Sequence, residues 1–196
     1  MKFLLAPVLV ILVASQTGFS DEAKKEKVRE AKWGTFSLKI PESWKEIPSS
    51  SNMRVATLEI PAAKGDAEKG ELAIFSFPGG GGNINDNVKR WISQFASEGR
   101  KANVVKGKAG ENEYVLADIT GTYNKPDGPP FLRKTKPAPG YRMLSVILLV
   151  GGKDGAAPPK VYYLKLTGPD KTVKAQAKAF RTSFGGSSEK EEEFAL

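Results

Sequence analysis

The chain of 196 residues contains no histidine and no cysteine, which excludes disulfide stabilisation, histidine-activated nucleophiles and most zinc sites. Its 30 Lys and Arg residues outnumber 22 Asp and Glu residues, and the net charge of +8 favours anionic neighbours. Nucleic acid is disfavoured as a partner, because the aromatic residues are spaced as core residues and are not interleaved with basic ones. The length predicts one domain.

Residues 1–20 predict a signal peptide. Lys2 is followed by the apolar run 3–14, FLLAPVLVILVA, and then by small and polar residues, which is the order of a secretory leader. The run is shorter than the roughly 20 apolar residues of a spanning helix. We expect cleavage between Ser15 and Ser20, with the later site favoured and an uncleaved anchor as the alternative. The mature protein would be periplasmic or secreted by a bacterium, with no transmembrane span. The charged residues of 21–32 predict a linker.

Three strand patterns come before any helix. In TFSLKI (35–40), MRVATLEI (53–60) and ELAIFSF (71–77) the side chains alternate between two faces, as in half-buried strands. Strands that follow one another without helices between them favour an antiparallel or mixed sheet.

A helix is predicted between Ile84 and Gly99, where apolar residues recur at helical spacing behind the capping residue Asn83. Four glycines, 79–82, precede it. A phosphate-binding loop would need a Lys and a Ser or Thr at the start of the helix, and this sequence has neither there. The glycines therefore predict a flexible joint between strand and helix.

The second half predicts four more strands and a closing helix. A proline-rich segment, 124–140, predicts a long loop, which in a compact domain is usually functional or disordered. The fold class is α+β, with a largely antiparallel sheet of about six to seven strands flanked by helices in an α/β/α sandwich. The remaining predicted elements are strands at 103–109, 112–123, 141–150 and 160–168, a helix at 169–184 and an acidic disordered tail at 187–196.

Three segments of the predicted domain, 33–186, carry a resemblance to a known family. FSLKIPESW, RWISQF and YYLKLTGPDKTVKAQAKAFRTSF resemble the Mog1/PsbP-like superfamily, in which a largely antiparallel sheet lies between helices. The resemblance implies a binding or assembly role, and the leader points to its bacterial envelope branch, which is DcrB-like. It implies no ligand and no partner-site residues for this chain.

No set of residues predicts catalysis. Glu111 and Glu113 lie at a turn with Asp118 in the next strand, and acids at turns are more often solvated than paired for acid/base chemistry. The acids between Asp66 and Glu71 lack the spacing of a calcium loop. We therefore expect no enzyme activity, no catalytic residue, no metal and no cofactor.

Two basic surfaces are the candidate binding sites. The proline-rich segment combines positive charge with apolar residues, which suits a partner or an anionic surface better than plain solvation does. The closing helix carries a cationic ridge opposite its apolar stripe, although a solvated outer face would look the same. The predicted binding residues are Phe131, Arg133, Lys134, Lys136 and Arg142 in the first surface, and Lys171, Lys174, Lys178 and Arg181 in the second.

The function predicted from the sequence is an exported, non-catalytic binding or assembly module of the cell envelope. Its basic surface would contact an acidic protein, lipid headgroups or polysaccharide. The alternative is a protein that binds or hydrolyses a small molecule at a site between the sheet and the Gly/Pro-rich loops.

Overall fold

The computed structural model describes residues 26–49, 51–128, 132, 134–151 and 159–196, so the predicted leader and its cleavage site lie outside the described residues. Among the helices of the described residues, none is long and apolar enough to cross a membrane. The helices and strands are β1 (Val28–Trp33), β2 (Phe36–Pro41), β3 (Lys45–Ile47), β4 (Arg54–Ile60), β5 (Gly70–Ser76), α1 (Ile84–Ile92), β6 (Lys101–Ala109), β7 (Asn112–Pro126), β8 (Thr135–Val150), β9 (Lys160–Pro169), α2 (Asp170–Ser183) and β10 (Glu192–Glu193).

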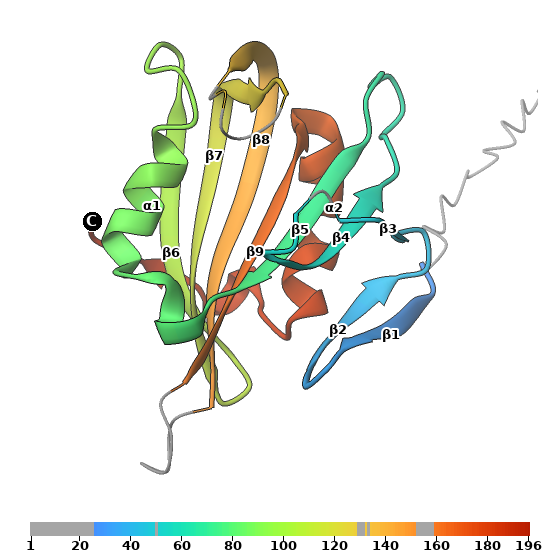
Figure 1. The fold of residues 1–196 in the computed structure, drawn as a ribbon, viewed down its shortest axis with the longest axis vertical. Coiled ribbons are helices and arrows are strands. Elements are labelled where there is room, and N and C mark those ends of the chain that lie inside the picture. Colours follow the sequence, from blue (N-terminus) through green and yellow to red (C-terminus); the bar gives the residue numbers. More distant parts are fainter. Residues whose placement is uncertain (1–25, 50, 129–131, 133, 152–158) are drawn as a thin grey trace, which may run out of the picture.

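Eight strands form one sheet in the order β10-β6-β7-β8-β9-β5-β4-β3, and each neighbouring pair is antiparallel (Figure 1). The predicted α+β class with a large antiparallel sheet is confirmed, but the sheet has more strands than expected. β3 and β10 have only three and two residues, too few to leave an alternating pattern in the sequence. β1 and β2 pair with each other as a separate hairpin.

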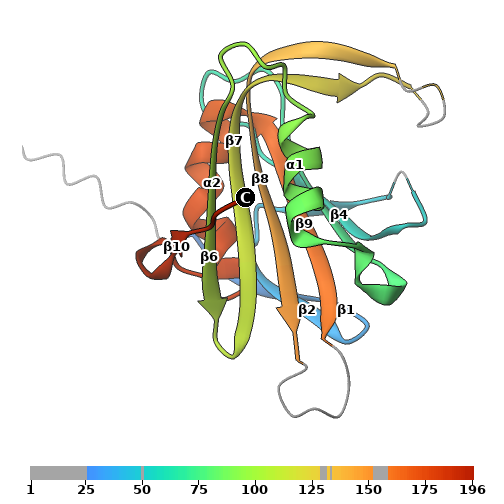
Figure 2. The same cartoon turned by 90° about the vertical axis from the view of Figure 1, so that its left-hand side faces the viewer.

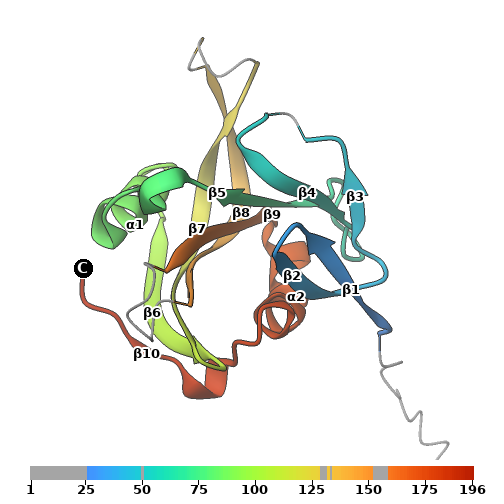
Figure 3. The same ribbon diagram turned by 60° about the horizontal axis from the view of Figure 1, so that its bottom comes forward.

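One face of the sheet carries the larger core, under α2 and the β1–β2 hairpin (Figure 3). Leu72 of β5 and Leu164 of β9 point to this side, and Phe180 of α2 packs in the same fully buried cluster. Burying one such side chain contributes roughly 1.5–3 kcal/mol. Trp44 is also fully buried, and its indole nitrogen donates to the side chain of Gln176 in α2 at 3.1 Å.

The opposite face is covered in part by α1 (Figure 2). The side-chain oxygen of Asn83 accepts from the backbone N–H groups of Asn85 and Asp86, as expected of a cap. The helix ends at Ile92, earlier than predicted, and Phe95 instead forms a buried bridge with Tyr123 of β7. α1 contacts β7 and, through edge-to-face packing of Trp91, reaches β9, so the β5 and β4 side of this face is not under the helix.

The glycine stretch joins β5 to α1, as predicted, and turns tightly beside Tyr163 of β9. The Tyr163 hydroxyl donates to the carbonyl of Gly80 at 2.6 Å. Gly81 has a φ of 72°, and a Cβ there would lie 2.7 Å from that hydroxyl, so both the backbone conformation and the close contact require glycine.

The predicted proline-rich loop is wrong for most of its length, because β7 and β8 run through it as a paired ribbon. We call residues 122–126 and 134–140 the arm. It projects beyond the sheet after a register shift between Gly121 and Tyr123 (Figure 3). Prolines are tolerated in the arm because a strand at an edge leaves some backbone N–H positions unpaired. Phe131 and Arg133, two of the predicted binding residues, lie outside the described residues.

Both ends of the domain also differ from the prediction. Residues 28–32 of the expected linker belong to β1, which pairs with β2. The acidic tail is not a solvated end, because Glu192 and Glu193 pair with β6 and Glu191 forms a two-pronged ion pair with Arg181 at 2.8 and 3.1 Å. Both segments are rich in charged residues, so their sequences did not predict strands. Edge strands nevertheless often carry charged residues.

Candidate functional site

A hollow of about 450 Å³ lies on the α1 side of the sheet, where the helix does not cover it. β4, β5 and β9 supply its floor, and the base of the arm supplies one wall. The hollow is lined by residues that include Arg54, Glu71, Phe75, Tyr123, Lys125, Tyr141, Lys165 and Thr167. A concave site of this size, with aromatic walls and a few polar groups, fits the usual form of a small-molecule site.

Lys165 reaches the hollow because β9 alternates between the two faces of the sheet. Leu164 and Leu166 point into the core under α2, so Lys165 and Thr167 point the other way. Directly across from Lys165 are Ala73 on β5 and Ser145 on β8. These two small side chains leave space around the long lysine side chain.

The ammonium group of Lys165 is held by neutral partners. Its Nζ donates to the side-chain oxygen of Gln94 at 2.7 Å and to the hydroxyl of Tyr123 at 3.1 Å. The same nitrogen lies 5.2 Å from the centre of the Tyr123 ring, within the range of a cation–π contact. Among the described residues, no carboxylate lies within ion-pair distance of Lys165.

Burial changes the protonation of both members of this pair. Loss of contact with water disfavours the charged ammonium and lowers the pKa of Lys165 to about 8, with Arg54 and Arg90 acting in the same direction and Glu71 against them. Burial also raises the pKa of Tyr123 to about 12, so its phenol stays neutral near pH 7. The hollow therefore contains an amine that gives up its proton more readily than ordinary lysines do.

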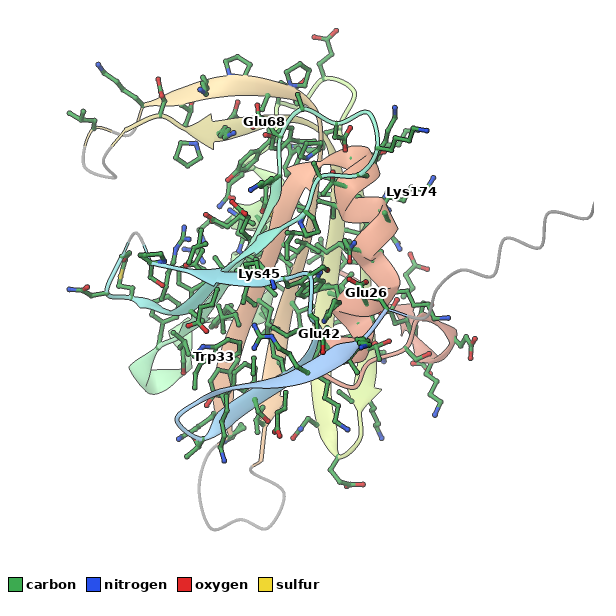
Figure 4. The ribbon with its side chains drawn as sticks, turned by 90° about the vertical axis from the view of Figure 1, so that its right-hand side faces the viewer. Glu26, Trp33, Glu42, Lys45, Glu68 and Lys174 are labelled. Carbon is green, nitrogen blue, oxygen red and sulfur yellow. The ribbon has the colours of Figure 1, made fainter. Side chains whose placement is uncertain are left out.

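The other cations that line the hollow have carboxylate partners. Arg54 binds Glu71 at 2.9 Å and Lys69 binds Glu59 at 2.6 Å. Lys125 binds Glu68, the acid that Figure 4 shows beside the arm. Lys165 is thus the one cation of the hollow, within the described part of the chain, whose partners are all neutral.

Glu68 closes a cluster at the rim. Besides Lys125, it accepts a hydrogen bond from the hydroxyl of Tyr141 at 2.6 Å. These hydrogen bonds, from Lys125 first and then Tyr141, lower the pKa of Glu68, and the bond to Glu68 raises the pKa of Lys125. The loop that carries Glu68 is fixed to α2 by Asp66, which accepts from the N–H and the hydroxyl of Thr172. The rim is therefore tied to the arm on one side and to α2 on the other.

Two buried hydroxyls accompany Lys165. The Oγ1 of Thr167, which lines the hollow, and the Oγ of Ser145, across from Lys165, have no hydrogen-bond partner within the described residues. Most buried hydroxyls in proteins have a partner, and an unpaired one costs roughly 1–3 kcal/mol.

The predicted basic residues that the structure describes are placed in two ways. Lys134, Lys136, Lys171, Lys174 and Lys178 are exposed, and Lys174 points away from the sheet (Figure 4).

Two further predicted residues are bound inside the molecule. Arg142 binds Asp118 on β7 and Asp170 at the start of α2, and Arg181 binds Glu191 of the tail. Arg142 therefore joins the base of the arm to α2 and brings the two predicted surfaces next to each other, but it is not a free cation. Arg142 and Arg181 were predicted as binding residues, and in the structure both form ion pairs with acids of this chain.

The residues of the hollow were not singled out from the sequence. Lys165 did leave a signal, since it interrupts VYYLKLT, one of the two most hydrophobic strand patterns in the chain. Gln94 and Tyr123 left none, because only the fold brings them to Lys165. In the described part of the chain, no group of three or more acids, histidines or cysteines could hold a metal ion.

Comparison with known proteins gives a weak structural likeness. No family model matches the chain. No curated protein matches it either. Among solved structures, it is similar to the solution structure of cyanobacterial PsbP (CyanoP) from Synechocystis sp. PCC 6803, with a TM-score of 0.47 and 11% sequence identity over 91% of this chain and 99% of that one. The DcrB-like branch stays a prediction.

Proposed function

We propose that this chain is a non-catalytic binding protein that holds a small organic anion, a carboxylate, in the hollow. The observation that carries the proposal is the half-buried Lys165 in the hollow, whose ammonium has only neutral partners. Removing a charge from water is costly unless an opposite charge or strong hydrogen bonds replace the lost solvation. A carboxylate beside Nζ would supply that charge and form a charge-assisted hydrogen bond.

The rest of the lining supports the same ligand class. Four cationic side chains and two acidic ones line the hollow, so its field favours an anion. The rings of Phe75 and Tyr123 offer apolar contact. The location that we propose is the bacterial envelope, on the strength of the leader-like residues 1–20.

Titration calorimetry with acetate, succinate and citrate tests the proposal. We expect at least one of them to bind, and Lys165→Gln to weaken its binding about tenfold or more, the equivalent of about 1.4 kcal/mol. Lys165→Arg keeps the charge and should bind better than Lys165→Gln. The matched control is Lys174→Gln, which removes an exposed charge outside the hollow and should leave affinity unchanged.

The dependence of ligand affinity on pH and on ionic strength provides a second test. Affinity should be constant between about pH 7 and pH 8, where the three acids are ionised, and fall above pH 8, because Lys165 then loses its proton. It should change little with ionic strength, since a buried pair is screened much less than an exposed one. No binding by any of the three acids, or equal binding by the wild type and Lys165→Gln, would contradict the proposal.

The exposed lysines of α2 support a second candidate function, contact with an acidic macromolecule of the envelope. Lys171, Lys174 and Lys178 lie along one side of the helix, and no acid within the described residues forms an ion pair with them. Their row is about 10 Å long at the helical rise of 1.5 Å per residue.

A pull-down of the tagged mature protein from its native envelope at two ionic strengths tests this second candidate. Capture of an acidic partner should weaken steeply with salt and disappear in the triple variant Lys171→Glu, Lys174→Glu and Lys178→Glu. Reversal of Lys134 and Lys136 shows whether the arm takes part. Capture that ignores both salt and the α2 reversals would exclude the ridge.

A further inference from the structure

The surroundings of Lys165 suit an amine that reacts as well as binds. An ordinary exposed lysine is protonated near neutral pH and has no free electron pair on its nitrogen. Partial burial of Lys165 shifts its balance toward the neutral amine, and the side chain lines the hollow, which a small molecule can enter. Lysines with this combination act as nucleophiles toward carbonyl carbons.

The position of the nitrogen is fixed from two sides. Gln94, which follows α1, accepts one hydrogen bond from it, and Tyr123 on β7 accepts another. Ala73 and Ser145 on the flanking strands are too small to cover it. The hydrogen bonds to Gln94 and Tyr123 therefore fix the position of the nitrogen at the floor of the hollow.

We propose that Lys165 captures its ligand covalently as an imine, so that the ligand is a small carboxylic acid that also carries an aldehyde or keto group. This inference rests on the proposed function and names its ligand class. The electron pair of the neutral amine attacks the carbonyl carbon, and a C–N bond replaces one C–O bond. The two amine protons leave with the carbonyl oxygen as water, and a C=N bond remains. Amine and carbonyl yield imine and water, with no oxidant or reductant.

The side chains of Tyr123 and Arg54 are placed to assist the formation of the imine. The hydroxyl of Tyr123 lies 3.1 Å from Nζ and stays a neutral phenol, so it can pass a proton to the departing oxygen. Arg54 donates to Glu71 and Thr57 through Nη1 alone, and its Nε and Nη2 form no hydrogen bond within the described residues. The guanidinium therefore keeps donors for the carboxylate of the ligand.

The test uses glyoxylate, which combines an aldehyde with a carboxylate, and cyanoborohydride, which reduces an imine to a stable adduct. The full-length protein is treated at pH 8, and peptide mapping measures the carboxymethyl adduct at each lysine. We expect Lys165 to be modified about tenfold faster than Lys171, Lys174 and Lys178, which serve as internal controls in the same molecule. Because the comparison is made in the wild type, it does not depend on whether a variant folds.

Three further experiments test the separate parts of the proposal. Acetaldehyde lacks the carboxylate and should modify Lys165 more slowly than glyoxylate does. Succinate should protect Lys165 by competing for the hollow, and Lys165→Arg should lose the fast adduct. Modification of Lys165 no faster than that of the exposed lysines would overturn the capture of a carbonyl. If succinate still bound in that case, the proposed function would stand without it, and if succinate did not bind either, both would fail.

Discussion

At the scale of single residues, Lys165 carries the functional proposal, and its energetics follow from what surrounds it. The unfolded chain has no hollow, so there the lysine has its ordinary pKa of 10.5, against about 8 in the folded protein. Between those two values the unfolded state binds more protons than the folded state. The free energy of unfolding that Lys165 contributes therefore rises with pH over this window.

Lys165→Met removes this dependence and keeps most of the side-chain volume. We expect the difference in unfolding free energy, wild type minus variant, to be flat below about pH 8. From there toward pH 10.5 it should increase in favour of the wild type, by up to about 1.4 kcal/mol per pH unit. Urea unfolding followed by fluorescence at a series of pH values measures it. A difference that is constant across this range would show that Lys165 is not desolvated.

The hollow could be predicted from the sequence only at Lys165. The alternation of β9 places this charge on the face opposite Leu164 and Leu166, which marks it as unusual in so apolar a strand. The partners Gln94 and Tyr123 are separated from it by 71 and 42 residues. Pairings over such distances depend on strand order, which periodicity does not specify.

At the scale of elements, the tail shows how an acidic segment becomes part of the fold. Glu191 accepts a bidentate bond from Arg181 and a further bond from the Tyr114 hydroxyl at 3.1 Å, and its side chain is only 7% exposed. Burial, followed by the nearby charge of Glu191, raises the pKa of Tyr114 to about 12. This contact anchors the segment that leads to β10 along the edge strand β6.

Glu191→Gln should destabilise the protein by about 1–3 kcal/mol, because Arg181 would keep a largely buried charge without its partner. Glu192→Gln is the matched control. Its side chain is 76% exposed and lies 3.5 Å from Lys106, so its loss should cost less than about 0.5 kcal/mol. Urea unfolding of both variants measures the two costs. Equal effects would mean that the tail is not anchored at Glu191.

Elements whose sequences show alternation or helical periodicity could be predicted. Elements that form only because they contact neighbouring segments could not. β4 to β9 and both helices follow apolar patterns that appear in the sequence. The arm was missed because prolines usually end strands, and they are tolerated here in a ribbon with open edges. β3, β10 and much of β1 were missed because they are short or charged and are held by their neighbours.

At the scale of the whole molecule, one sheet has two unlike faces. The larger core under α2 provides stability, whereas α1 covers only part of the other face and leaves the hollow between itself, β4 and the arm. The chain carries a positive net charge, which would attract an anion before it reaches Lys165. The exposed lysines of α2 lie on the other side of the sheet, so the two candidate functions can be tested independently (Figure 4).

The proposed carboxylate site depends most on Lys165 being a desolvated cation that an anionic ligand would stabilise. NMR titration of the protein with ¹³C-labelled lysine side chains, with and without succinate, measures this directly. We predict a Lys165 pKa of about 8 in the free protein, moving back toward the ordinary value of 10.5 when succinate is bound. An ordinary pKa in the free protein, or one that succinate leaves unchanged, would contradict the account.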